Sequence, residues 1–144
     1  MMTRVDEDVS RLRIALARTS RWLDRNSATD GLTRTQLSVL GSTARRGPLG
    51  LGELAELEGI NPTMLSRIVG KLDDAGYLRR IPDVTDRRAA QVQATEAGVA
   101  LHLRHRAERT AMLTERLADL PAEHRTALLA AVPALEALQQ AGPS

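Results

Sequence analysis

Residues 51–76 constrain the fold of this chain most strongly, because they predict two short helices joined by a tight turn. Gly59 is suited to the left-handed conformation in which many helices end. Asn61 can cap the helix that follows, and Pro62 fits its first position, where no backbone N–H is needed. Two helices joined this closely must share one hydrophobic core.

Each of the two predicted helices has one apolar and one polar face. Inward positions at helical spacing hold Leu51, Leu54 and Leu57 in the first helix and Leu65, Ile68, Val69 and Leu72 in the second. Outward positions hold Glu53, Glu56 and Glu58 in the first helix and Thr63, Ser66, Arg67, Gly70 and Lys71 in the second. The outer face of the first helix is therefore acidic, whereas that of the second combines hydroxyls with cations.

A β-hairpin is predicted directly after the second helix. Residues 77–81 and 90–94 alternate in the way of half-buried strands. The polar connection between them contains Asp86, Arg87 and Arg88, and the two arginines have no packing role there. Asp86 can hold one guanidinium group extended through a charge-assisted hydrogen bond. A solvated run of charges is the alternative interpretation of this hairpin tip.

Two paired helices followed by a polar-tipped hairpin predict a winged helix-turn-helix. In such folds the second helix enters the major groove of double-stranded DNA. Thr63, Ser66 and Arg67 then lie close to base edges, near the N-terminal end of that helix. Arg79 and Arg80 lie where phosphates run, and the arginines of the hairpin tip suit a narrow minor groove. Without DNA binding, the same helix pair would be an ordinary helical hairpin.

Amphipathic helices are predicted on both sides of this segment. An apolar stripe with spacings of four and three runs over residues 5–23. A further helix begins at Thr33, with Gln36 at the position of a capping box. A long helix covers residues 95–119, and Pro133 kinks or splits the last one. The outer stripes exceed what a small winged domain can cover, which predicts a two-fold dimer, with a folded-back monomer as the alternative.

Composition excludes several classes of protein. The chain of 144 residues has no cysteine, which rules out disulfides, thiolate metal ligands and a cysteine nucleophile. No apolar run approaches the roughly 20 residues of a membrane span, and no signal-peptide pattern opens the sequence, so we expect a cytoplasmic protein without a membrane partner. Phosphate-binding glycine loops, nucleophile elbows and paired carboxylates are missing, so we do not expect an enzyme. The formal net charge of +2 identifies no partner by itself.

The stretches LTRTQLSVL, LGELAELEGINPTMLSRIVGKLDDAGYLRR and DVTDRRAAQVQATEAG resemble the multiple-antibiotic-resistance (MarR) family of transcriptional regulators. The D-x-R hairpin tip followed by a T-E-x-G helix start is the most specific part of the resemblance. Two positions depart from the family pattern. Gly50 stands where a Ser or Thr cap is common, and Met64 replaces a residue that is frequently small.

The resemblance implies a mainly α fold with a small β-hairpin wing (α+β), in which N- and C-terminal dimerisation helices flank the winged helix-turn-helix. The whole chain, 1–144, would be one domain of this type. Its DNA-binding lobe would span residues 32–98, and its helical dimerisation lobe would combine residues 1–30 and 99–144. The implied function is that of a homodimeric repressor bound to a pseudo-palindromic operator and released by a small-molecule ligand.

Position and resemblance together give a set of expected DNA-binding residues. They are Pro62, Thr63, Ser66, Arg67, Lys71, Arg79, Asp86, Arg87 and Arg88. The resemblance implies that Arg88 enters the minor groove, that Asp86 orients it, and that Arg87 contacts phosphate or groove. The alternative function, from a different class, is a protein–protein interaction module that no longer binds DNA.

A small aromatic or anionic ligand is a further partner that the resemblance implies. Trp22 would line its pocket and Arg45 or Arg46 would meet a carboxylate, although interface packing explains Trp22 equally well. His102 and His105 stand three residues apart on one helix face, which is a possible metal spacing. The remaining ligands would have to come from elsewhere, so we expect no metal and no cofactor.

Overall fold

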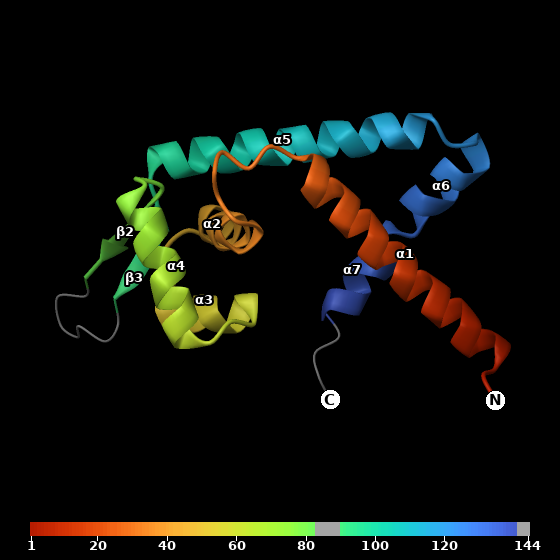
Figure 1. Ribbon diagram of the computed structural model, residues 1–144, viewed down its shortest axis with the longest axis horizontal. Coiled ribbons are helices and arrows are strands. Elements are labelled where there is room, and N and C mark those ends of the chain that lie inside the picture. The colour runs from red at the N-terminus through yellow and green to blue at the C-terminus, as the bar shows by residue number, and fades with distance from the viewer. Residues whose placement is uncertain (83–89, 141–144) are drawn as a thin grey trace. The chain divides into compact units, whose positions relative to one another are not determined.

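The computed structural model describes residues 1–82 and 90–140, and this part is mainly helical with one small antiparallel sheet (Figure 1). The helices are α1 (Arg4–Asn26), α2 (Arg34–Arg46), α3 (Leu51–Glu58), α4 (Pro62–Asp74), α5 (Glu96–Ala118), α6 (Ala122–Ala130) and α7 (Val132–Gln140). The strands are β1 (Leu49–Gly50), β2 (Leu78–Ile81) and β3 (Gln91–Ala94). The prediction of a mainly α fold with a small β wing is confirmed.

The chain forms two compact units, Met1–Glu108 and Arg109–Ser144. The first contains α1 to α4, the sheet and the beginning of α5. The second contains the end of α5 with α6 and α7, and these two short helices meet at Ala131, close to Pro133. The predicted split of the last helix at this proline is therefore confirmed, since proline cannot donate the helical hydrogen bond.

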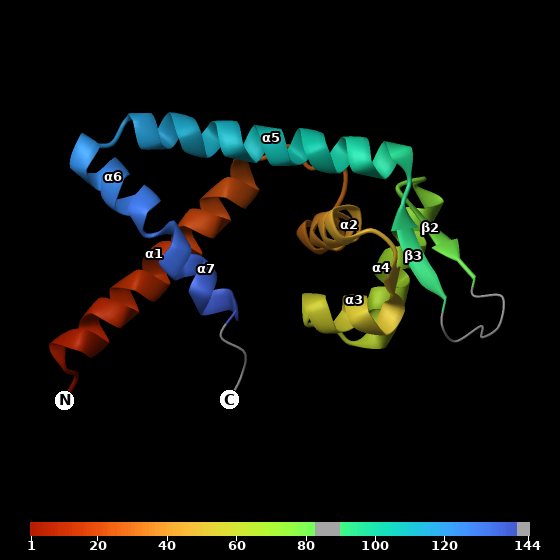
Figure 2. The ribbon, with the colours of Figure 1, turned by 180° about the vertical axis from the view of Figure 1, so that it is seen from behind.

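The hydrophobic core of the first unit lies among α2, α3, α4 and the sheet, which cluster together in both ribbon views (Figure 1, Figure 2). Its buried members are Val39, Leu40, Leu49, Leu54, Ala55, Leu65, Ile68, Val69, Leu72, Leu78, Val92 and Leu101. All four predicted inward positions of α4 are among them. Because α4 buries a continuous stripe at helical spacing, its opposite face is fixed in direction.

Several helix starts follow the predicted capping pattern. The N–H of Gln36 donates to Oγ1 of Thr33 (3.1 Å), and the N–H of Thr33 donates to Oε1 of Gln36 (2.8 Å), which is a complete capping box. At the start of α4, the N–H of Met64 donates to Oδ1 of Asn61 (2.8 Å). Gly59 ends α3 in the left-handed region with φ of 63°. The tight joint between α3 and α4 is thus built as the sequence predicts.

The sheet contains a strand that the sequence does not predict. Its order is β1-β3-β2, and Leu49 of β1 lies opposite Val92 of β3. Two residues are too few to show an alternating pattern, and the pairing joins segments far apart in the chain. Gly50 leads directly into α3 as an N-cap without a side-chain hydrogen bond. The first paired helix is therefore attached to the wing at its start.

Two predictions for α3 are wrong. Leu57 is 45% exposed and does not belong to the core, where Ala55 is buried instead. Glu58 does not simply face solvent, because its carboxylate accepts hydrogen bonds from the hydroxyl groups of Ser38 (2.7 Å) and Ser42 (2.5 Å) of α2. Helical spacing on so short an element fixes the buried side only within about one residue, which explains both errors.

The end of α4 is fastened to the start of α5 through the residues around Tyr77. The N–H of Thr95 donates to the carbonyl of Tyr77 (3.0 Å), and Oγ1 of Thr95 donates to the carbonyl of Gly76 (2.6 Å). The same Oγ1 accepts from the N–H of Gly98 (3.1 Å), which caps α5. A Cβ on Gly98 would lie 2.0 Å from the Tyr77 carbonyl oxygen. The T-E-x-G pattern therefore marks a close backbone contact between the start of α5 and the residues that directly follow α4.

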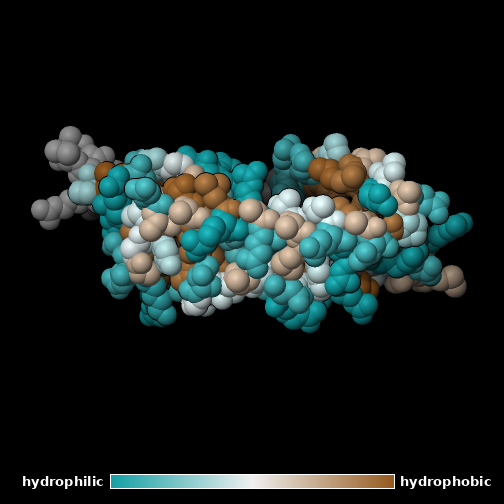
Figure 3. All heavy atoms as spheres, turned by 90° about the horizontal axis from the view of Figure 1, so that it is seen from above, coloured by the Kyte–Doolittle hydropathy of each residue, from teal (hydrophilic) through white to brown (hydrophobic). Residues whose placement is uncertain are grey.

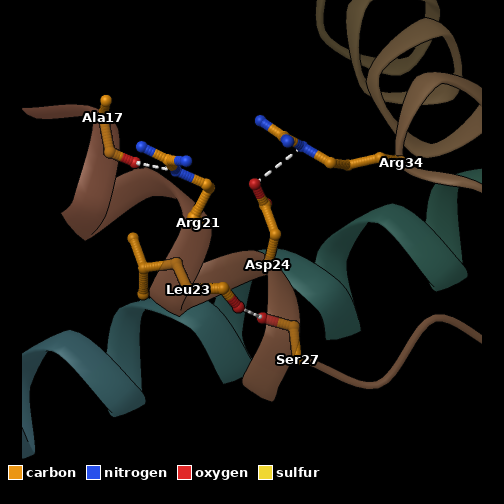
Figure 4. A network of polar contacts seen from close by, with 6 residues as sticks. All are labelled: Ala17, Arg21, Leu23, Asp24, Ser27 and Arg34. Atoms are coloured by element: carbon orange, nitrogen blue, oxygen red, sulfur yellow. Dashed lines mark hydrogen bonds and ion pairs between the residues drawn. The ribbon is translucent and has the colours of Figure 1, made fainter.

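Polar contacts join α1 to α2, and join the loop between these helices to α5. Nε of Arg34 lies 2.6 Å from Oδ2 of Asp24, and Figure 4 shows the two side chains extended toward each other. The carboxylate of Glu108 on α5 accepts from the backbone N–H of Ala28 (2.9 Å), and Arg104 lies 3.6 Å from Asp30. The α1–α2 connection is thus held against α5 by charged groups.

Large apolar side chains remain exposed on α1 and on the C-terminal helices. No residue of α1, α6 or α7 is buried. The exposed apolar residues include Val5, Val9, Leu12, Leu16, Leu128, Leu129, Val132 and Leu138. Figure 3 shows hydrophobic side chains reaching the surface in patches between hydrophilic ones. No helix in the described part of the chain is both long and apolar enough to cross a membrane.

Candidate DNA interface

The outer face of α4 carries the residues that the sequence predicts for base contacts. Pro62, Thr63, Ser66, Arg67 and Lys71 are all exposed, whereas the inward residues of the same helix are buried. Pro62, Thr63, Ser66 and Arg67 together line a shallow depression in the surface. The structure therefore brings four of the predicted residues into one site at the N-terminal end of α4.

The cations of this face are not neutralised within the described part of the chain. No hydrogen bond or ion pair between described residues engages Arg67 or Lys71. The first turn of α4 contains no acidic residue. Both the backbone N–H groups of a helix N-terminus and a free guanidinium favour an anionic partner. The surface is therefore suited to a polyanion that also offers hydrogen-bond donors and acceptors.

The wing contributes two further arginines from β2. Arg79 lies opposite Gln93 of β3, and its guanidinium donates to Oε1 of that residue from Nη2 (2.9 Å) and Nε (3.3 Å). Arg80 is exposed beside it. Arg79 is thus held along the sheet by its cross-strand neighbour. Asp86, Arg87 and Arg88, predicted for the wing tip, lie outside the described residues.

The residues predicted to bind a small ligand occupy different helices. Trp22 is half-buried on α1, and Arg45 and Arg46 are exposed at the end of α2. A Cβ added at Gly41 would lie 3.1 Å from Nη1 of Arg45 and 3.4 Å from Nδ1 of His102, so both side chains converge there. Sequence reasoning missed this contact, because it depends on how α5 packs against α2.

His102 is the titratable group that its surroundings perturb most clearly in this region. Burial lowers the pKa of His102 below its ordinary value, and the positive charges of Arg45, Arg106 and His105 lower it further. The neutral imidazole is therefore the form that the fold favours. The charged groups that shift the pKa of His102 are Arg45, Arg106 and His105, and none of them is a carboxylate.

The possible metal spacing of His102 and His105 is not completed in space. Among residues 1–82 and 90–140, no group of three or more His, Cys, Asp and Glu side chains is placed to hold a metal ion. Glu108, which lies three residues beyond His105, instead accepts the hydrogen bond from the backbone of the α1–α2 loop.

Comparisons with known proteins agree with this geometry. The family model described as "MarR family" matches residues 32–90. The "Uncharacterized HTH-type transcriptional regulator Mb0904" of Mycobacterium bovis is 33% identical over 93% of this chain and 94% of its own length. These matches cover both the winged segment and the helices that flank it.

Solved structures of similar fold support the same assignment. A MarR family protein from Bacillus stearothermophilus aligns with a TM-score of 0.83 at 18% identity, covering 97% of this chain and 99% of the other. The PcaV transcriptional regulator from Streptomyces coelicolor, solved in complex with its natural ligand, aligns with a TM-score of 0.66 at 19% identity, covering 94% and 96%. At these identities the structures show the shared fold.

A winged helix-turn-helix whose second helix leaves an uncompensated cationic face exposed defines a class of DNA-binding transcriptional regulators. This chain belongs to the MarR family of that class.

Proposed function

We propose that two copies of this chain form a homodimeric repressor, which binds a pseudo-palindromic operator and is released by a small-molecule ligand. The observation that carries this proposal is the exposed, capped N-terminal end of α4 with its unpaired Arg67. In a two-fold dimer two such helices enter successive major grooves, about 34–36 Å apart along the DNA. Pseudo-palindromic half-sites then match the symmetry of the protein.

Contacts to DNA divide into base recognition and positioning. Thr63, Ser66 and Arg67 contact base edges, with the guanidinium of Arg67 placed for the two acceptors of a guanine. Pro62 brings the helix start close to the backbone, and Lys71, Arg79 and Arg87 meet phosphates. Arg88 enters the minor groove, held extended by Asp86. These roles follow from exposure and position on α4 and β2, and from family resemblance for the wing tip.

Dimerisation would use the exposed apolar stripes of the outer helices. Residues 1–30 and 99–144 would form the dimerisation lobe, and residues 32–98 the DNA-binding lobe. The stripe of α1, with Val5 69% exposed and no buried member, supports an interface there because single exposed apolar residues are ordinary but a continuous stripe is not. The C-terminal helices leave Leu128 and Leu138 exposed in the same way.

An aromatic or anionic ligand would relieve DNA binding. The cationic surroundings of Arg45 and His102 suit a carboxylate, and the half-buried Trp22 supplies an aromatic surface. The presence of a natural ligand in the structure of PcaV supports a ligand for this chain also. Arg46, at the end of the same helix as Arg45, would contribute a second cation.

Selection of DNA from a pool of random duplexes tests this function directly. The purified full chain should retain duplexes that share one inverted repeat, and it should sediment as a dimer in the absence of DNA. Weakening of the complex by a small carboxylate such as salicylate would support a ligand-released repressor. A monomer, or a pool without any shared sequence after selection, would contradict the proposal.

A further inference from the structure

Met64 is a large apolar side chain exposed on the first turn of α4. Met64 is 52% exposed. It is the third residue of α4, the helix that the proposed function places in the major groove. Its backbone is not free to turn the side chain away, because the N–H of Met64 donates to the Asn61 cap at 2.8 Å. The residue therefore has a fixed position at the end of the helix nearest the DNA.

Helix geometry places Met64 beside Arg67 and apart from Ser66. Residues three apart on a helix are neighbours, so Met64 and Arg67 share an edge of the exposed face. The depression at the start of α4 is lined by Pro62, Thr63, Ser66 and Arg67, and Met64 is not part of its lining. Met64 thus flanks Arg67 on the side away from the hydroxyl groups of this face.

The major groove contains a single type of apolar group, the C5-methyl of thymine. Every other base edge there offers hydrogen-bond donors or acceptors, and a thioether side chain satisfies them poorly. Among the base edges of the major groove, that methyl is the group on which a methionine can best pack its methylene and methyl groups away from water. Its flexible, polarizable side chain adapts to an irregular surface of this kind.

We infer that Met64 is a specificity-determining residue that contacts the C5-methyl of one thymine in each half-site. The inference rests on the proposed function, since it requires α4 to lie in the major groove. It adds an apolar contact to the hydrogen bonds expected from Thr63, Ser66 and Arg67. Arg67 and Met64 together then specify a guanine and a thymine at nearby positions of the half-site.

Replacement of single thymines by deoxyuridine tests the contact without changing any hydrogen bond. The duplex is the inverted repeat recovered by selection with the parent protein, and each thymine of a half-site is replaced in turn. At one position, the substitution should lower the affinity of the parent protein about fourfold per half-site. This is the affinity ratio that corresponds to the free energy of burying about one methyl group. M64A should bind the thymine duplex about as weakly as the parent binds the uracil duplex, and should not distinguish the two.

Three further variants separate this contact from other effects. M64L should keep the preference for thymine, and M64Q, of similar length, should lose it. L57A is the matched control, because Leu57 is 45% exposed on α3 and should leave the thymine preference intact. Since Met64 is exposed, all variants should melt near the parent temperature.

The outcomes distinguish this inference from the proposed function. If the parent binds its selected duplex but no deoxyuridine substitution weakens it, the inference is wrong and the function stands. The same holds if M64A remains as sensitive to deoxyuridine as the parent. If selection recovers no shared sequence, the proposed function and the inference fail together.

Discussion

Gly98 lies against the carbonyl group of Tyr77 so closely that a Cβ on Gly98 would be 2.0 Å from the carbonyl oxygen. The same Cβ would lie 3.1 Å from Cδ1 of Leu40 in the core. Backbone on one side and a buried leucine on the other leave no room for a side chain. This contact gives a physical reason for the glycine of the T-E-x-G pattern.

Replacing Gly98 by alanine should lower the free energy of unfolding by about 1–3 kcal/mol, the cost of forcing extra atoms into a packed site. Urea denaturation followed by circular dichroism measures the change. G52A is the matched control, because Gly52 lies in a helix and nothing lies within 4 Å of its added Cβ. That control should keep or increase stability. An unchanged midpoint for G98A would show that α5 can move away from Tyr77 at no cost.

If Arg67 makes the proposed bidentate contact to a base, replacing it by alanine should weaken operator binding by about 1–3 kcal/mol and relax the preference at one base pair of the half-site. Lys71→Ala should weaken binding to all duplexes alike and reduce the slope of log affinity against log salt by about 1. Fluorescence anisotropy titrations at several salt concentrations measure both quantities. Equal relaxation of sequence preference by the two variants would contradict the assigned roles.

If Arg88 enters the minor groove as proposed, replacing it by alanine should weaken operator binding without unfolding the proposed dimer, because a cation is then lost from the groove. Affinity is measured by titration of the operator duplex, and integrity by thermal melting. Arg18→Ala, an exposed arginine of α1, serves as the control and should leave affinity unchanged. Parental affinity in the Arg88 variant would remove the wing tip from the interface.

The fold should lose stability as the pH falls below the ordinary histidine pKa of 6.5, because of His102. The lowered pKa of His102 in the folded state means that the unfolded chain takes up the proton first. Stability should fall through this window and level off once the folded form is protonated too. Urea unfolding at a series of pH values measures the effect for the parent and for His102→Asn.

Two variants check the cause of this pH dependence. His102→Asn should remove the part of the slope that His102 contributes, since no titrating group remains at that position. Arg45→Gln should reduce it, because one of the positive charges that disfavour the protonated imidazole is gone. Identical slopes for the parent and His102→Asn would show that other groups dominate the acid response.

The sequence predicts most of the local structure because its helix starts and stops are encoded by neighbouring residues. Each of these signals determines a helix boundary within a few residues of its own position. The structure confirms the boundaries predicted from Thr33 with Gln36, from Gly59, from Asn61 and from Pro133. Short-range hydrogen bonds and backbone preferences are sufficient to fix these boundaries.

The parts that the sequence does not predict depend on contacts between distant segments. The pairing of Leu49 with Val92 creates β1, and the hydroxyl of Ser42 turns Glu58 from an outward charge into a link between α2 and α3. The approach of His102 to Arg45 likewise requires α5 to be in place. Periodicity describes one element at a time and carries no information about such pairs.

The exposed residues of α4 were predictable because the helix buries four residues at regular spacing, which leaves Thr63, Ser66 and Arg67 outside. Met64 stood out in the sequence only as bulkier than its family position favours. Its significance emerges from its exposed fraction together with its place in the first turn.

The fastening of Thr95 and Gly98 to Gly76 and Tyr77 has a mechanical consequence. It joins the residues that directly follow α4 closely to the first turn of α5, a helix of 23 residues. We therefore expect a tilt of α5 to move the C-terminal end of α4 with it. A ligand that displaces the N-terminal end of α5 would then change the orientation of α4, the helix proposed to contact DNA, without touching α4 itself.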